Sequence, residues 1–223
     1  MIRENVMKIR SALEAAAISA GRDPREITLC AATKMNDAQR VREAIAAGVD
    51  CCGENRVQEL TEKSAQNAYE GAPVHFIGHL QTNKVRQVVG KVDLIQSVDS
   101  RRLLEAIHKE AQKQGICQDI LLEINVAAEE SKSGFDPEQL PEVLELAATL
   151  DGVRVIGLMA IPPASQNPGD NIHWFTKMRQ LYETVPGGRI LSMGMSDDFT
   201  DAIACGSTMI RVGTAIFGRR NYN

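Results

Sequence analysis

The chain has 223 residues, of which 43% are hydrophobic and 24% are charged, and its formal net charge at pH 7 is −4. This composition is ordinary for a globular protein, and the weakly acidic balance predicts no nucleic-acid partner and no membrane partner. Because no apolar run is long enough to span a bilayer and the N-terminus has no signal-peptide pattern, we expect a cytoplasmic protein.

Short apolar runs alternate with segments of helical periodicity along the chain, after a first helix expected at about Glu4–Ala20. The expected strands are Ile27–Thr33, Val49–Gly53, Val74–Gly78, Asp93–Val98, Ile120–Val126, Val153–Ala160, Arg189–Met193 and Thr208–Val212. The expected helices between them are Asp37–Ala47, Arg56–Tyr69, Asn83–Val89, Ser100–Gln114, Pro137–Leu150, Asn171–Thr184 and Asp198–Cys205. Such alternation predicts parallel strands joined by crossover helices.

Eight strands of this kind close a barrel. We therefore predict an α/β fold, a (β/α)8 TIM barrel formed as a single domain by residues 1–223, with the extra N-terminal helix plugging or flanking it. A doubly wound open sheet is the alternative. That fold usually has a glycine-rich fingerprint after the first strand, where this chain has Thr33-Lys34-Met35-Asn36, so the barrel is favoured.

Residue types suited to a phosphorylated aldehyde stand at the predicted strand ends, where barrels carry their chemistry. Lys34 ends the first strand. A lysine there is usually a solvated surface residue, but one turned into the barrel mouth with a lowered pKa can attack an aldehyde. Ser196, Gly213 and Thr214 follow strands seven and eight, where barrels bind phosphate, and Ser196 would also cap the helix that begins near Asp197. Together they predict a phosphorylated aldehyde held as a Schiff base on Lys34.

Arg211, which we expect across the barrel ring from Lys34, has two interpretations. It either pairs with a carboxylate such as Asp197 or Glu123, or donates a hydrogen bond to a pyridine nitrogen. An always-charged donor would keep that nitrogen unprotonated and weaken the ring as an electron sink.

Four further residues are candidates for contacts with the same ligand. His79 is either a packed side chain or an acid–base group. Asn55 and Asn125 either orient a ring oxygen of the ligand or satisfy backbone groups at the strand ends. Met193 is expected to make an apolar contact.

Cysteine and histidine spacing predicts no metal site. None of the five cysteines has CxxC spacing, and His75, His108 and His173 do not have the spacing of metal ligands with one another. Cys51 and Cys52 are expected to point to opposite faces of a strand, as buried, reduced thiols.

With Lys34, His79, Ser196 and Arg211 in place, the chain resembles the pyridoxal phosphate homeostasis protein family, whose fold is similar to the N-terminal barrel of alanine racemase. The resemblance spans nearly the whole chain. The matching stretches are Ala32-Thr-Lys34, Gly53-Glu-Asn-Arg-Val-Gln-Glu59, His75-Phe-Ile-Gly-His-Leu-Gln-Thr-Asn-Lys84, Ser97-Val-Asp99, Lys132-Ser-Gly-Phe135, Gly157-Leu-Met159, Ser192-Met-Gly-Met-Ser-Asp197 and Gly206-Ser-Thr-Met-Ile-Arg-Val-Gly-Thr-Ala-Ile-Phe-Gly218.

The resemblance implies that the ligand is pyridoxal 5′-phosphate, bound as an internal aldimine on Lys34. It also implies that Ser196, Gly213 and Thr214 hold the phosphate and that Arg211 faces the pyridine nitrogen. The family is thought to buffer this cofactor in cells and deliver it, with pyridoxal-phosphate-dependent apo-enzymes as recipients and without an established catalytic turnover.

One departure from the family concerns the residues that follow the Schiff-base lysine. The family usually has a second lysine two residues later, followed by proline, where this chain has Asn36 and Asp37. A role assigned to that second lysine therefore does not carry over to this chain.

Two other functions stay open. A pyridoxal-phosphate enzyme such as a weak amino-acid racemase would need a second acid–base group, and none of the three tyrosines (Tyr69, Tyr182 and Tyr222) stands at a predicted strand end. A cofactor-free Schiff-base aldolase acting on a sugar phosphate would be colourless. Because the second domain of alanine racemase is missing, we expect a monomer.

Overall fold

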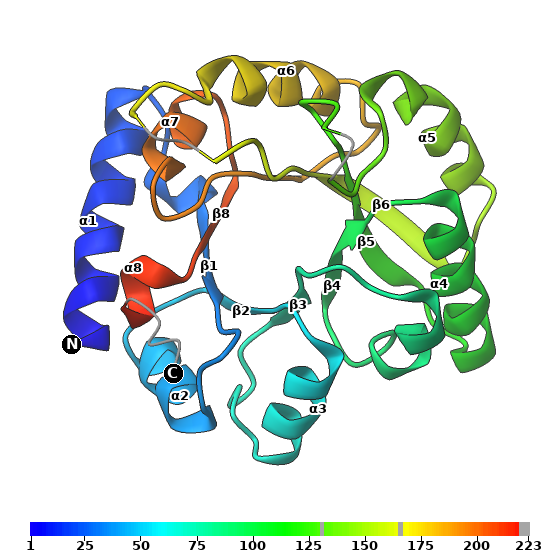
Figure 1. The fold of residues 1–223 in the computed structure, drawn as a ribbon, viewed down its shortest axis with the longest axis horizontal. Coiled ribbons are helices and arrows are strands. Elements are labelled where there is room, and N and C mark those ends of the chain that lie inside the picture. The colour runs from blue at the N-terminus through cyan, green and yellow to red at the C-terminus, as the bar shows by residue number, and fades with distance from the viewer. Residues whose placement is uncertain (130–131, 165–166, 219–223) are drawn as a thin grey trace.

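The computed structural model describes residues 1–129, 132–164 and 167–218. In these residues eight parallel strands form a closed barrel in chain order, with β8 paired to β1 and helices around the outside (Figure 1). The predicted barrel is thus confirmed. Its strands are β1 (Thr28–Ala32), β2 (Cys51–Glu54), β3 (Val74–Phe76), β4 (Leu94–Val98), β5 (Gln118–Glu123), β6 (Val153–Met159), β7 (Ile190–Ser192) and β8 (Met209–Val212).

The α-helices are α1 (Ile2–Ser19), α2 (Ala38–Ala46), α3 (Val57–Ala65), α4 (Arg101–Gln114), α5 (Leu140–Ala148), α6 (Ile172–Tyr182), α7 (Phe199–Ala204) and α8 (Thr214–Phe217). The described residues also form three 3₁₀ helices: η1 (Pro24–Glu26), η2 (Thr82–Gln87) and η3 (Pro137–Gln139). The α-helix predicted at Asn83–Val89 is wrong in type, because η2 occupies that position. The predicted helix Arg56–Tyr69 is too long, since α3 ends at Ala65 and Asn67 has a positive φ of 50°.

Helix α1 flanks the barrel and does not plug it. Its buried residues repeat every three or four positions, as expected for a helix with one apolar face. This face packs in one cluster with residues of β1, α7, β8 and α8, so α1 covers the seam where the barrel closes (Figure 1). The buried residues are Ile2, Val6, Ile9, Leu13 and Ala17.

The barrel interior has an apolar part and a polar part. Leu94, Leu121, Ile156 and Met159 form one small cluster inside the ring of strands. Other inward side chains are polar and equally buried: His75, Gln96, Ser192 and Arg211. Because buried polar groups need hydrogen-bond partners, their interactions define the interior beneath the barrel mouth.

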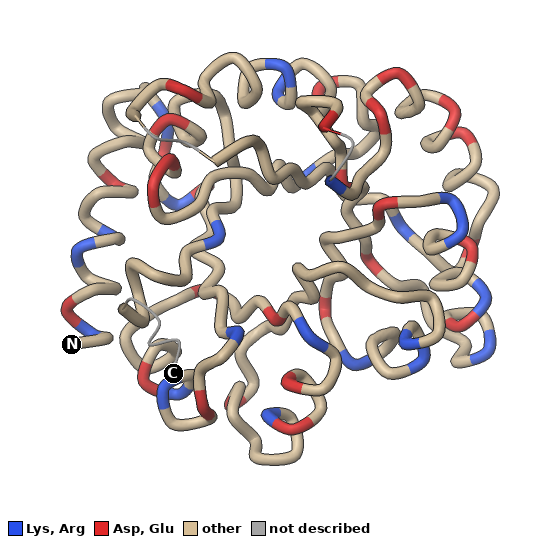
Figure 2. Tube along the Cα trace, viewed as in Figure 1, with Lys and Arg blue, Asp and Glu red and all other residues tan. Residues whose placement is uncertain are grey.

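Charged residues of both signs are distributed around the outer helices and loops (Figure 2). In the described part of the chain, no helix combines the length and the apolar character needed to cross a membrane.

Candidate functional site

Lys34 lies two residues after the end of β1, at the carboxyl end of the barrel, and is half-buried. The next residue, Met35, has a positive φ of 60°, a conformation that costs free energy for a residue other than glycine. Its N–H donates to Glu59 Oε2 at 2.6 Å. Asn36 Nδ2 donates to the carbonyl oxygen of Lys34 at 3.0 Å. These contacts fix the main chain on the C-terminal side of Lys34.

The two residues that depart from the family pattern build this turn. Asn36 Oδ1 accepts a hydrogen bond from Arg40 Nε at 2.9 Å, and Asp37 caps α2 by accepting from the backbone N–H of Arg40. Arg40 also donates to the carbonyl oxygen of Phe217, at the end of α8. The turn after Lys34 is thereby joined to the helix that follows β8.

On the N-terminal side of Lys34, a buried ion pair between Glu54 and Lys63 holds the end of β1. The Glu54 side chain is fully buried, and its Oε1 accepts from Lys63 Nζ at 2.7 Å, from Thr33 Oγ1 at 2.5 Å and from Tyr69 Oη at 3.2 Å. Burial raises the pKa of the Glu54 carboxyl, and the charge of Lys63 opposes that rise. The expected strand Val49–Gly53 ends next to Glu54, but the sequence pattern does not predict this network.

Arg211 lies on the strand next to Lys34. β8 pairs with β1, with Cys30 opposite Arg211, so the expected position across the ring is wrong. The guanidinium is buried: Nη1 donates to Ser192 Oγ at 2.6 Å and Nη2 to the Ala160 carbonyl oxygen at 2.9 Å. Among the described residues, its hydrogen-bond partners are thus a hydroxyl and a carbonyl oxygen, and neither predicted carboxylate is among them.

The three residues predicted to hold phosphate come together after β7 and β8. Ser196 Oγ accepts a hydrogen bond from the backbone N–H of Ala215 at 3.3 Å, which brings it to the turn that contains Gly213 and Thr214. The predicted cap is wrong, because Asp198 is the N-terminal residue flanking α7 and Ser196 faces α8. Ser196 is half-buried and Thr214 is exposed.

Two other residues predicted to contact the ligand are not directed at the barrel mouth: Met193 faces outward, and Asn125 bonds within its own loop. Met193 is fully buried in the cluster outside the strands, so its side chain is turned away from the barrel mouth. The Asn125 amide bonds the backbone of Glu129: Nδ2 donates to the carbonyl oxygen at 2.9 Å, and Oδ1 accepts from the N–H at 3.2 Å. This matches the second interpretation of Asn125, a residue that satisfies backbone groups.

A cavity of 290 Å³ lies beside the mouth, lined by residues of the β2, β3 and β5 ends. Asn55 and His79 both line it. The β2 and β3 ends approach so closely that a Cβ on Gly78 would lie 2.2 Å from the carbonyl oxygen of Asn55. Within the described residues, the buried Asn55 Oδ1 has no hydrogen-bond partner. A buried acceptor without a donor is costly, so Asn55 is suited to a ligand that donates a hydrogen bond.

Glu123 is an acid–base candidate that sequence reasoning considered only as a partner for Arg211. It ends β5, is 7% exposed and lines the same cavity. Burial, with a smaller contribution from Asp99, raises the pKa of Glu123 to about 7. Asp99 in turn accepts from His79 Nδ1 at 2.9 Å. The alternation of side chains along a strand would have identified Glu123, because Leu121, two residues earlier, also faces the interior.

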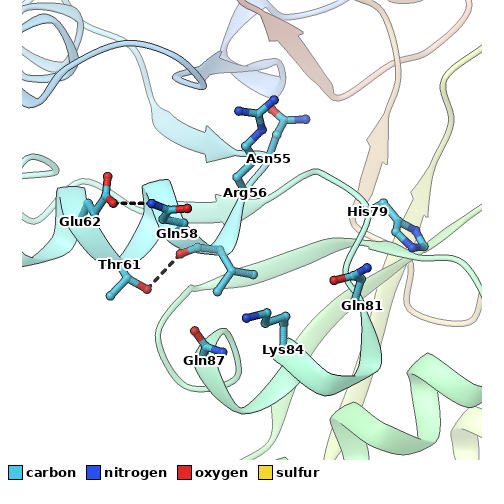
Figure 3. Close-up of a pocket in the computed structure, with 10 residues that line it drawn as sticks. Asn55, Arg56, Gln58, Thr61, Glu62, His79, Gln81, Lys84 and Gln87 are labelled. Carbon is cyan, nitrogen blue, oxygen red and sulfur yellow. Dashed lines mark hydrogen bonds between the residues drawn. The ribbon is translucent and has the colours of Figure 1, made fainter.

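A larger groove of 730 Å³ lies outside this cavity and shares Asn55 and His79 with it. Figure 3 shows Arg56, from the β2–α3 junction, on one side and Lys84, from η2, on the other. The rest of the lining is mostly amide and hydroxyl side chains, with Glu62 hydrogen-bonded to Gln58 at 2.9 Å. The groove is therefore polar, and it carries one cationic side chain on each of its two sides.

The comparisons with known proteins agree with this geometry. Residues 2–221 match the family model described as alanine racemase, N-terminal domain. A pyridoxal phosphate homeostasis protein of Aquifex aeolicus is 41% identical over 224 residues, covering 98% of each chain. The chain belongs to the pyridoxal phosphate homeostasis protein family. The predicted family is thus confirmed.

Two solved structures share the fold of this family member. PipY of Synechococcus elongatus, solved with PLP bound, superposes with a TM-score of 0.83 at 34% identity, covering 98% of this chain and 100% of that chain. A protein of Bifidobacterium adolescentis described as unknown gives a TM-score of 0.90 at 38% identity, covering 97% of this chain and 94% of the other.

Proposed function

We propose that this protein binds pyridoxal phosphate at the barrel mouth, as a Schiff base on Lys34, and serves as a store of the cofactor. The observation that carries the proposal is the arrangement around the β1–β8 seam. Lys34 follows β1, Arg211 lies on the adjacent β8, and Ser196 meets the turn after β8. An amine, a fixed cation and a hydroxyl-lined turn are the groups that the aldehyde, the ring nitrogen and the phosphate require.

Each residue has a separate task in this proposal. Ser196, Gly213 and Thr214 bind the phosphate, and Arg211 donates to the pyridine nitrogen. When bound, the cofactor supplies an electron-withdrawing ring, and a donor that keeps its charge limits that property. The guanidinium already donates to Ser192 and Ala160, so its plane is fixed before the ligand arrives.

The fit of the cofactor is supported by Asn55. Its buried Oδ1 has no partner among the described residues, and a phenolic hydroxyl or an iminium N–H would supply the missing donor. Gly213 lets the turn after β8 lie close to β1, because a Cβ there would lie 3.3 Å from the Cβ of Ala32.

We further propose that pyridoxal-phosphate-dependent apo-enzymes receive the cofactor from this protein, which acts in the cytoplasm as a monomer. The polar groove beside the mouth supports delivery, because it shares Asn55 and His79 with the inner cavity and so gives a recipient a surface next to the site.

Weak racemase activity is a second candidate, favoured by one observation. Glu123 lines the mouth cavity with a pKa near 7, where a proton donor and acceptor is most effective. Of the tyrosines weighed for that role, Tyr69 is bound to Glu54, and Tyr222 lies outside the described residues. Loss of alanine racemisation in Glu123→Gln, with cofactor binding retained, would support turnover.

An absorption spectrum tests the main proposal. Purified protein should show a near-visible band that borohydride abolishes, and peptide mapping should then locate the reduced cofactor on Lys34. Lys34→Ala should lack the band, whereas a control with the exposed Lys109→Ala should keep it. No band after addition of pyridoxal phosphate, or label on another lysine, would contradict the proposal; a colourless protein would favour the sugar-phosphate aldolase.

A further inference from the structure

Three possible metal-ligand atoms meet inside the barrel, and one of them belongs to Cys30, which stands opposite Arg211 on the neighbouring strand. Cys30, Cys51 and His75 each offer one ligand atom, and all three atoms lie within 4.8 Å of one another. The three residues are 0%, 2% and 7% exposed. Local Cys and His spacing predicts no metal site because these donors come from three separate strands, β1, β2 and β3.

The strand register explains why the donors converge. Cys30 pairs with Cys51 across β1 and β2, which places both thiols on the inner face. On the next pair of strands, His75 stands opposite Gly53. A Cβ on Gly53 would lie 3.0 Å from the Sγ of Cys30 and 2.7 Å from Ile77 Cδ1. Glycine at this position therefore leaves room for the Cys30 thiol.

The separations suit a metal ion. Cys51 Sγ lies 3.6 Å from His75 Nδ1. With metal–sulfur and metal–nitrogen bonds of about 2.3 and 2.0 Å, a tetrahedral ion holds such a pair about 3.5 Å apart. Gln96 Nε2 is 2.9 Å from the same Nδ1, in position to donate to it, and this orientation leaves Nδ1 as the unprotonated nitrogen. An ion would replace that hydrogen bond.

We propose that Cys30, Cys51 and His75 bind one thiophilic d¹⁰ metal ion, Zn²⁺ or Cu⁺. Two sulfur atoms and one imidazole nitrogen form a donor set that favours these ions over Mg²⁺ or Ca²⁺, which prefer oxygen. Zn²⁺ would take a fourth ligand, and Met209 packs against both cysteines in the same cluster; Cu⁺ accepts soft sulfur ligands at lower coordination.

A hydrogen-bonded path connects this cluster to the cofactor site. Gln96 Oε1 accepts from Ser192 Oγ at 2.7 Å, and Ser192 Oγ accepts from Arg211 Nη1 at 2.6 Å. An ion on His75 Nδ1 displaces the amide of Gln96, and the displacement reaches Arg211 through one hydroxyl. Metal occupancy should therefore alter the spectrum or the affinity of pyridoxal phosphate, although metal binding itself does not rest on the proposed cofactor function.

The test uses the full-length protein, reduced and freed of metal, with and without pyridoxal phosphate. Co²⁺, a spectroscopic substitute for Zn²⁺, should bind with one-to-one stoichiometry and give ligand-field bands in the red, where pyridoxal phosphate does not absorb. Zn²⁺ should displace it, and Cu⁺ is titrated separately against a colorimetric chelator. At an ion concentration of about one hundred times the dissociation constant, the melting temperature should rise by roughly 5–10 °C.

The variants are Cys51→Ser, which nearly keeps the side-chain volume, and His75→Gln. Either should weaken binding at least about tenfold, whereas the double control Cys117→Ser, Cys205→Ser, which leaves the cluster intact, should bind as the original chain does. Melting curves of the metal-free variants show whether each is folded. The effect on metal binding is judged from a variant that is folded. No ion bound, binding unchanged in the folded variant, or a Cys30–Cys51 disulfide formed without ion uptake would overturn the proposal.

Discussion

Replacing Glu123 with glutamine should stabilise the protein at pH 8 and change its stability much less at pH 5. The carboxyl is 7% exposed, and its pKa is raised from 4.5 to about 7 by burial and then by Asp99. Between pH 4.5 and about pH 7, the folded protein keeps a proton on Glu123 that the unfolded chain releases. The free energy of unfolding therefore falls as the pH rises.

The size of the effect follows from the two pKa values. A rise from 4.5 to about 7 in the pKa of Glu123 corresponds to about 3 kcal/mol of destabilisation once the pH exceeds 7, and most of this cost is absent at pH 5. A neutral amide of the same shape does not carry the ionised group into the cavity. In a chain of this length, about 3 kcal/mol corresponds to roughly 6–12 °C in melting temperature.

Thermal unfolding followed by circular dichroism at pH 5 and pH 8, without added pyridoxal phosphate, measures the difference. Glu145→Gln on the exposed surface of α5 is the matched control, expected to change stability by less than about 0.5 kcal/mol at both pH values. A Glu123→Gln difference that is the same at both pH values, or a variant less stable than the original at pH 8, would refute the reasoning.

Three further substitutions test the packing around the site. Lys63→Met leaves the buried Glu54 carboxylate without its cation and should lower the free energy of unfolding by about 3–5 kcal/mol in urea at pH 7; an unchanged midpoint would contradict the ion pair. Gly78→Ala forces its Cβ against Asn55 and should cost about 1–3 kcal/mol and weaken pyridoxal phosphate binding in a spectral titration, so normal affinity would argue against Asn55 as a ligand. Leu13→Ala in α1 should cost about 2–5 kcal/mol by thermal melting, and a smaller loss would mean that α1 packs loosely.

The barrel was predictable because its strands are buried on both faces. Such strands appear as short apolar runs, and all eight expected runs overlap the observed strands. The error at η2 has a local cause, since the apolar residues Val85, Val88 and Val89 at i, i+3 and i+4 resemble a helix face, while the chain forms a tighter 3₁₀ turn there. The closing pair β1–β8 follows from the closed topology and corrects the position of Arg211.

Side-chain direction was the harder part of the site. Met193 follows Ser192, whose hydroxyl faces the interior, so strand alternation alone turns Met193 outward. The bonds of Ser196 to α8 and of Arg40 to Phe217 join segments distant in sequence, which periodicity does not relate. The roles of the predicted ligand-binding residues stay predictions until the cofactor is located.

The position of α1 has a consequence for synthesis on the ribosome. Val6, Ile9 and Leu13 emerge long before the residues that cover them, which include Phe199, Ile210 and Ile216. Until those residues are translated, the apolar face of α1 lacks these partners, and the first strand lacks its β8 neighbour. Contacts this far apart in sequence form late, so a nascent chain stalled before β8 exposes a hydrophobic helix, which is the kind of surface that chaperones bind and that aggregates.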